Sequence, residues 1–243
     1  MSGLRAWALP DLPEVRPGDD LGALLGAAEF EPGDVLVVAH KIVSKAEGAF
    51  RRLADVTASE RAVALAHEHG KDARHMQVVL DESAAVLRAQ RGVLICRTHH
   101  GFVCANAGVD TSNAPEPGTV VTLPRDPDAS ARALRATLPS RPAVVIADSF
   151  GRAWRHGQCD VAIGIAGLAP LDDWRGRNDG AGHELRATLI AVADEATAAA
   201  DLVRDKISRE PAVVIRGLQR YVGDDDGPGA TALIRPLAED LFT

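Results

Sequence analysis

Short apolar runs bounded by turn residues alternate along the chain with longer segments in which apolar and charged positions are mixed. Runs of this kind, rich in Val and Ile and too short for helices, are typical of buried strands. The run that begins at residue 34 follows the turn sequence Glu31-Pro32-Gly33, and the runs at 93–97 and 102–106 flank a short polar turn, which predicts a hairpin. Strands are predicted at residues 7–9, 34–39, 93–97, 102–106, 143–147, 161–166 and 212–216.

The mixed segments predict helices that lie between groups of strands. Thr57 and Glu60 have capping-box spacing before a helix that Gly70 ends, and Pro139 ends an alanine-rich helix. The alanine-rich helix is predicted at 128–138, and further helices are predicted at 20–28, about 72–87 and 194–206. The last of these follows a strand that begins near residue 185. Because strands and helices do not alternate regularly, we predict an α+β fold with mixed sheets and packed helices. Residues 1–243 are expected to form one domain or two closely packed subdomains.

Composition excludes several classes of function. The 243 residues suffice for a sizeable core, and 27 basic against 34 acidic residues, with 4% aromatic residues, argue against nucleic-acid binding. Three cysteines, Cys96, Cys104 and Cys159, without CxxC spacing fit reduced thiols packed as small apolar groups. No stretch fits a signal peptide or a membrane span, so a cytoplasmic protein without membrane contact is expected. The acidic run 224–226 is interpreted as a solvated loop.

Two apolar runs are each followed by an aspartate and a hydroxyl residue. Residues 102–109 precede Asp110 and Thr111, and residues 143–147 precede Asp148 and Ser149. A carboxylate and a hard oxygen at a rigid sheet edge can hold a divalent cation together with its phosphate ligands. The alternative is an Asx turn, in which each aspartate bonds its own downstream backbone. The repetition of the pattern favours a functional site.

The chain lacks the common signatures of nucleotide binding and of covalent catalysis. It has no GxxxxGK[ST] loop, no GxGxxG after a predicted strand and no GxSxG. Phosphates would therefore be held by scattered cations around a metal, and five candidates follow predicted strands: Lys41, Lys45, Arg152, Arg155 and His156. This arrangement favours metal-assisted phosphoryl transfer, which requires mainly positioning and charge neutralisation.

Several of these stretches, taken together and in order, resemble the coenzyme F420-0:L-glutamate ligase family. The resemblance is collinear over nearly the whole chain, and a series of motifs in order is far more specific than any one of them. The matching stretches are residues 12–20, 33–38, 42–48, 106–113, 148–152, 160–167 and 211–218.

The resemblance implies a GTP-dependent ligase with the fold of that family. Such an enzyme attaches L-glutamate to the phospholactyl tail of the deazaflavin F420-0, with release of GDP and phosphate, and the number of glutamates added stays open. It implies Mg²⁺ or Mn²⁺, with K⁺ as a further cation, and a homodimer. One metal would be held by Asp110 and Asp148 and a second by Ser149, while Lys45 and Arg152 would stabilise the transferred phosphoryl group. The residues implied to contact GTP are Leu12, Pro13, Glu14, Val15, His40, Lys45 and Asn113.

This chain departs from the family pattern at two places. His40 stands where relatives carry a small hydroxyl residue, and residues 204–210 replace a glycine-rich acidic nucleotide loop. Lys206 cannot coordinate a metal in the place of a carboxylate, although Asp205 or Glu210 could compensate. We also expect a stand-alone ligase without the C-terminal nitroreductase-like domain of actinobacterial relatives.

A homodimer has a second basis in the sequence, namely long apolar segments around residues 161–169 and 189–192, which offer more burial than a chain of this size needs. Two other functions remain open at this stage. A metal-dependent phosphohydrolase would need the same aspartates but no amine acceptor, and a non-catalytic nucleotide- or deazaflavin-binding module would need no intact metal site.

Overall fold

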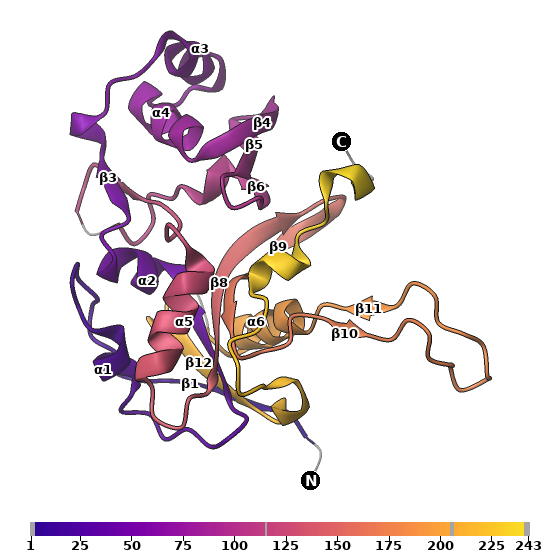
Figure 1. Ribbon diagram of the computed structural model, residues 1–243. Coiled ribbons are helices and arrows are strands. Elements are labelled where there is room, and N and C mark those ends of the chain that lie inside the picture. The colour runs from indigo at the N-terminus through magenta and orange to yellow at the C-terminus, as the bar shows by residue number, and fades with distance from the viewer. Residues whose placement is uncertain (1–2, 115, 205–206, 241–243) are drawn as a thin grey trace.

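The computed structural model describes residues 3–114, 116–204 and 207–240, which form two lobes and a projecting arm (Figure 1). The sheet lobe is built on a five-stranded sheet, and the small lobe comprises residues 50–121. Among the described residues, no helix is both long and apolar enough to cross a membrane.

The central sheet of the sheet lobe is mixed. Its parallel neighbours are β2 and β8, and its other neighbouring pairs are antiparallel. This arrangement confirms the prediction of mixed sheets with packed helices. The order across the sheet is β1 (Arg5–Ala8), β12 (Ala212–Arg216), β2 (Val35–Ala39), β8 (Ala143–Arg152) and β9 (Arg155–Ala166).

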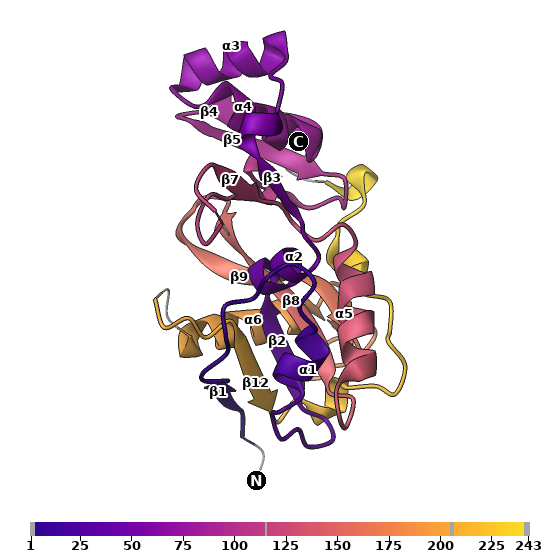
Figure 2. The ribbon, with the colours of Figure 1, turned by 90° about the vertical axis from the view of Figure 1, so that its left-hand side faces the viewer.

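Helices cover both faces of this sheet, because alternate residues of the central strands point to opposite sides (Figure 2). Leu36 and Val38 of β2 pack on the face covered by α1 (Leu21–Leu25), α2 (His40–Ala46) and α5 (Pro127–Thr137). Val35 and Val37 pack on the face covered by α6 (Val192–Val203). The four valine and leucine side chains are fully buried, which is why the run reads as continuously apolar in the sequence.

The small lobe has an apolar cluster of its own, in which Met76, Val79 and Leu94 are buried. Two helices pack against a three-stranded antiparallel sheet, and a two-stranded ribbon connects this unit to the sheet lobe. The elements are β3 (Phe50–Arg52), α3 (Glu60–His69), α4 (Ala73–Asp81), β4 (Ser83–Gln90), β5 (Val93–Thr98), β6 (Val103–Ala105) and β7 (Thr119–Val121).

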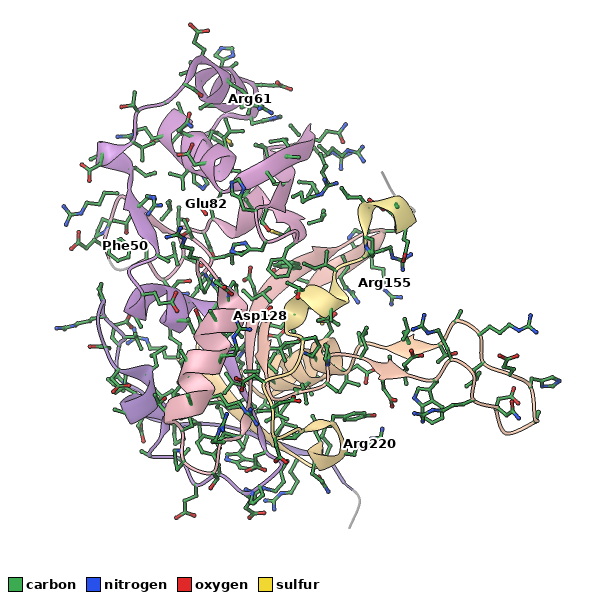
Figure 3. The ribbon with its side chains drawn as sticks, in the orientation of Figure 1. Phe50, Arg61, Glu82, Asp128, Arg155 and Arg220 are labelled. Carbon is green, nitrogen blue, oxygen red and sulfur yellow. The ribbon has the colours of Figure 1, made fainter. Side chains whose placement is uncertain are left out.

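The arm extends away from the sheet lobe, as Figure 1 shows, and its base is formed by β10 (Asp172–Asp173) and β11 (Leu189–Ile190). Short 3-10 turns complete the described structure at Leu53–Asp55, Asn106–Gly108, Gln219–Tyr221, Ala230–Leu233 and Leu237–Glu239. The C-terminal turns are tied back to the sheet lobe by Asp128, whose Oδ1 accepts hydrogen bonds of 2.8 Å from the backbone N–H groups of both Ile165 and Ala230 (Figure 3).

The boundaries of several predicted elements were wrong. The helix predicted over 72–87 ends at Asp81, and Ser83–Gln90 forms β4 instead, because these residues pair with β5 and tertiary pairing outweighs helix propensity. The helix predicted over 20–28 ends at Leu25, before Gly26. Ser59, not Thr57, caps α3 through a hydrogen bond from the Ala62 N–H. Of the strand predicted from residue 185, only Leu189–Ile190 pairs among the described residues, and the described part of the last helix ends at Val203.

The acidic run 224–226 is anchored to the protein interior rather than simply solvated. Arg135 of α5, whose side chain is only 3% exposed, donates to Asp226 Oδ1 at 2.7 Å and to the carbonyl oxygens of Gly223 and Asp225 at 2.7 and 3.0 Å. Gly167 permits this contact, because its φ is +78° and a Cβ there would lie 2.4 Å from Arg135 Nε.

We expect Arg135→Met to destabilise the protein by roughly 3 kcal/mol, because it removes the buried guanidinium that pairs with the Asp226 carboxylate and donates to three carbonyl groups. Arg141→Met is the matched control. Arg141 approaches the same carboxylate at 3.7 Å but is mostly exposed, so its loss should cost less than about 1 kcal/mol. Urea unfolding of both variants measures the difference, and equal midpoints would contradict the anchoring role of Arg135.

Candidate active site

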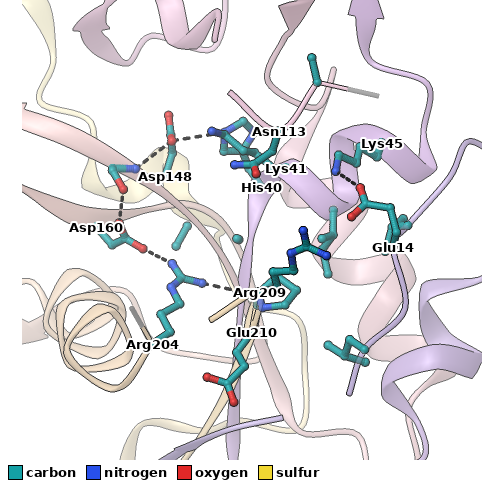
Figure 4. Close-up of a pocket in the computed structure, with 18 of the residues that line it drawn as sticks. Glu14, His40, Lys41, Lys45, Asn113, Asp148, Asp160, Arg204, Arg209 and Glu210 are labelled. Atoms are coloured by element: carbon teal, nitrogen blue, oxygen red, sulfur yellow. Dashed lines mark hydrogen bonds and ion pairs between the residues drawn. The ribbon is translucent and has the colours of Figure 1, made fainter. Parts of the chain in front are cut away.

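A cavity of about 460 Å³ lies where β2, β8 and β9 meet the start of α2 and the segment before β12 (Figure 4). Its volume falls in the range of roughly 300–1,000 Å³ that is typical of small-molecule sites. Residues from six separate parts of the chain line it: Leu12, Pro13, Glu14, Val15, Ala39, His40, Lys41, Ile42, Lys45, Asn113, Ala114, Ala147, Asp148, Ser149, Asp160, Arg204, Arg209, Glu210 and Pro211. All seven residues implied to contact GTP are in this set.

Helix α2 places two lysines in the cavity. It follows β2 directly, and its apolar residues Ile42 and Val43 pack into the core of the sheet lobe. Lys41 and Lys45 are one helical turn apart and share a face, so both ammonium groups point away from that core. The Lys45 side chain is 7% exposed and pairs with Glu14, which is mostly exposed.

His40 at the start of α2 contacts Asp148 at the edge of the sheet. Its Nδ1 lies 3.2 Å from Ser44 Oγ and its Nε2 lies 3.3 Å from Asp148 Oδ1. A neutral imidazole satisfies both contacts when Nε2 carries the proton, because Nδ1 then accepts from the Ser44 hydroxyl. His40 therefore holds the Asp148 carboxylate in place. The family resemblance implied a contact with GTP for His40 and did not predict this contact with Asp148.

A series of polar contacts runs from Asp148 on β8 through Asp160 on β9 to Arg204, as Figure 4 shows. Asp148 Oδ1 accepts from the Ser149 N–H at 2.8 Å, and Ser149 Oγ donates to Asp160 Oδ1 at 2.5 Å. The other carboxylate oxygen of Asp160 pairs with the guanidinium of Arg204. Sequence reasoning assigned no role to Asp160, although its position directly before the apolar run 161–166 was a signal. Its partner is 44 residues away, and no pattern in the sequence predicts that pairing.

Asp110 lies outside the lining of the cavity and is linked to it by Lys41. Lys41 Nζ donates to Asp110 Oδ2 at 2.5 Å, and Ser112 donates to both oxygens, through its N–H at 2.9 Å and its hydroxyl at 2.6 Å. Burial raises the pKa of the Asp110 carboxyl, but the hydrogen bonds from Lys41 and Ser112 outweigh it and lower the pKa to about 2. The carboxylate is therefore ionised at neutral pH.

Both aspartates, Asp110 and Asp148, accept a hydrogen bond from a downstream backbone N–H, as the Asx-turn alternative predicts, but each also faces a basic side chain.

The expectation that a strand leads directly to Asp110 was wrong. β6 ends at Ala105, and Asn106, Ala107 and Gly108 then turn with positive φ before Asp110 pairs with Val121. Gly108 is required there, because a Cβ would lie 2.7 Å from Leu123 Cγ.

The remaining predicted cations are not gathered in the cavity. Arg152, Arg155 and His156 lie at the outer end of the β8–β9 hairpin, exposed and outside the lining, as Figure 3 shows for Arg155. Arg152 Nη2 donates to the His156 carbonyl at 2.6 Å. Of the altered segment, Arg204, Arg209 and Glu210 line the cavity, while Asp205 and Lys206 lie outside the described residues.

The donor atoms at Asp148 fit a divalent cation. Its Oδ2 makes no hydrogen bond to any described residue, and a carboxylate oxygen at a cavity wall is a ligand that Mg²⁺ and Mn²⁺ prefer. No group of three or more His, Cys, Asp and Glu side chains within the described chain converges enough to hold a metal. A cation at Asp148 would therefore complete its coordination with phosphate oxygens and water. Ser149 fits a second cation poorly, because the carboxylate that its hydroxyl contacts, Asp160, is already paired with the guanidinium of Arg204.

Comparison with known proteins identifies the family of the chain. A family model described as F420-0:Gamma-glutamyl ligase matches residues 11–217. The coenzyme F420:L-glutamate ligase of Methanopyrus kandleri is 44% identical over 252 aligned positions, which cover 100% of both chains. The protein of the same name from Methanothermobacter thermautotrophicus is 39% identical over 99% of both chains, and that from Archaeoglobus fulgidus is 44% identical over 88% of both.

The family model spans most of the chain, and the matched region contains every described residue that lines the cavity. The similarity to the curated ligases extends over the full length of two of them. The chain therefore belongs to the F420-0:gamma-glutamyl ligase family and is an enzyme, a ligase of that family.

Proposed function

We propose that this ligase uses GTP to join L-glutamate to the phospholactyl carboxylate of F420-0, in the cavity between β8 and α2. The observation that carries this proposal is the distribution of charge in the cavity. Asp148 and Asp160 lie along one wall, and Lys45 with Glu14 lies across from them (Figure 4). A triphosphate with a divalent cation needs this combination of oxygen ligands and ammonium groups.

The reaction needs an activated carboxylate, because a carboxylate does not condense with an amine in water. A carboxylate oxygen of F420-0 attacks the γ-phosphorus of GTP, GDP leaves, and an acyl phosphate forms. The α-amine of glutamate then attacks the acyl carbon, phosphate leaves, and the amine loses a proton. In this proposal Lys45 stabilises the charge of the transferred group, and Leu12, Pro13, Val15 and Asn113 hold the nucleotide.

Asp148 would hold Mg²⁺ or Mn²⁺, which supplies charge neutralisation of the triphosphate. Asp110 would join it as a second carboxylate ligand only by giving up its contact with Lys41, because its two oxygens already accept hydrogen bonds from Lys41 and Ser112. Arg152 is exposed, lies outside the lining of the cavity and donates to the His156 carbonyl, so we assign it no contact with the transferred phosphoryl group.

One assay tests the proposal against the two other functions. GDP release is measured in Mg²⁺ and K⁺ buffer with F420-0 and L-glutamate supplied singly, together or not at all. The ligase requires both acceptors, a phosphohydrolase releases GDP with neither, and a binding module releases none. Mass spectrometry of the deazaflavin product then counts the glutamates added.

We also propose a homodimer, for which the arm is the supporting feature. Leu189 at its base is 43% exposed, and the buried indole N–H of Trp174 lacks a hydrogen-bond partner among the described residues. The apolar segment 161–169 does not support a dimer as predicted, because Ile163, Ile165 and Leu168 are buried inside this chain. We expect light scattering at micromolar concentration to give twice the 25.6 kDa chain mass, and a monomer mass would reject the dimer.

A further inference from the structure

The cavity contains a guanidinium where the family resemblance implies a second metal. Arg204 and Asp160 form an ion pair at the wall of the cavity, and Asp160 also accepts a hydrogen bond from the Ser149 hydroxyl. The Asp160 side chain is 1% exposed, so water cannot solvate its charge, and that charge requires a partner held in the protein. The guanidinium of Arg204 supplies this partner.

The orientation of Arg204 is set on two sides. Nη2 pairs with Asp160, and Nη1 donates to the Pro211 carbonyl at 3.2 Å. The Asp160 backbone is itself fixed, because the Thr197 hydroxyl of α6 donates to its carbonyl at 2.8 Å. These bonds use two of the five N–H donors of the guanidinium among the described residues, and Arg204 still lines the cavity. The remaining N–H groups of the guanidinium are therefore oriented to bind an anion with several oxygens.

The side chains of Ser149, Asp160 and Arg204 do not fit a second metal. A cation at Ser149 would lie beside the fixed positive charge of Arg204, and the Asp160 carboxylate that the Ser149 hydroxyl contacts is already paired with that guanidinium. From this geometry we infer that Arg204, positioned by Asp160, binds the terminal phosphates of the nucleotide in place of a second divalent cation. The inference rests on the proposed function, because it concerns the nucleotide site of the same ligase.

The test counts metal ions instead of turnover. Metal-free protein is saturated with β,γ-imido-GTP and titrated with Mn²⁺, and the electron paramagnetic resonance signal of unbound Mn²⁺ gives the number bound per chain. We expect one Mn²⁺ in the wild type. Two bound Mn²⁺ ions would overturn the inference and leave the ligase proposal intact. No binding of the analogue by the wild type would overturn the nucleotide proposal and this inference together.

Variants separate a phosphate contact from a purely structural ion pair. We expect Arg204→Met to weaken binding of β,γ-imido-GTP about 10- to 100-fold, the range for a lost charge-assisted hydrogen bond, and to change GMP binding less than about threefold. GMP lacks the terminal phosphates, so a merely structural role would weaken both ligands equally. Arg204→Lys should recover part of the loss, because it restores the charge without the planar fork.

Folding is controlled with the double variant Asp160→Asn/Arg204→Met, which removes both charges and leaves no unpaired buried carboxylate. It should melt within a few degrees of the wild type and show the same selective loss of β,γ-imido-GTP binding. Arg88→Met serves as the surface control, since Arg88 is exposed on β4 in the small lobe. A double variant that binds the analogue as the wild type does would overturn the role of Arg204.

Discussion

Asp148→Ala is expected to abolish ligation while the protein stays folded. The carboxylate lies at the cavity wall, where His40 holds one oxygen and leaves the other without a hydrogen bond to any described residue. Loss of a cation ligand removes several kcal/mol of charge stabilisation. At about 1.4 kcal/mol for each tenfold in rate, turnover should fall by about 10³-fold. The structural cost is smaller, about 1–3 kcal/mol, because the variant loses the hydrogen bond to the Ser149 N–H and the contact with the buried His40 imidazole.

Two further variants show whether the loss comes from charge or from folding. Asp148→Asn keeps the shape and the hydrogen bonds but not the anion, so it should lose nearly as much activity as the alanine variant. Asp173→Ala removes an exposed aspartate of the arm that pairs with Arg175, and it should leave turnover unchanged. Turnover and thermal melting are measured together. A stable Asp148→Ala protein with turnover within tenfold of the wild type would remove Asp148 from the proposed metal site.

The strands of the fold were predictable because local pattern and final environment agree there. Ala212–Arg216 forms a strand with the predicted bounds, since its apolar residues are buried on both faces of the sheet. Residues 83–87 of β4 were misassigned because their alanines and leucine favour a helix locally. Only pairing with β5, a contact outside the segment itself, makes them a strand.

The candidate site was predictable where its residues follow strands and not where two distant segments meet. His40 and Lys45 follow the end of β2. Asp148 and Ser149 lie within the parallel strand β8, directly beyond its last pairing with β2, Ala147 with Ala39, so these four residues meet at the end of β2. The Asp160–Arg204 pair depends on how α6 lies against β9, and spacing along the chain holds no information about that. Arg152 shows the converse error, because β8 continues beyond the cavity and carries this residue outward.

Lys45→Ala is expected to raise the GTP concentration needed for half-maximal turnover about 10- to 100-fold and to lower kcat as well. The Lys45 ammonium is nearly buried, while its partner Glu14 is mostly exposed, so a bound phosphate can replace Glu14 without leaving an unsolvated carboxylate. A charge-assisted hydrogen bond of this kind contributes about 1.5–3 kcal/mol, which corresponds to the expected range.

Lys41→Ala separates the two lysines of α2. Lys41 is already engaged by Asp110 and Ser112, so its removal should weaken GTP use less than the loss of Lys45 does. Glu14→Gln adds a sharper distinction. If Glu14 only neutralises Lys45 before the nucleotide arrives, this variant should bind GTP as well as the wild type or better, because the phosphates no longer compete with a carboxylate for the ammonium. Isothermal titration with GTP measures all three variants, and an unchanged affinity in Lys45→Ala would exclude Lys45 from the phosphate site.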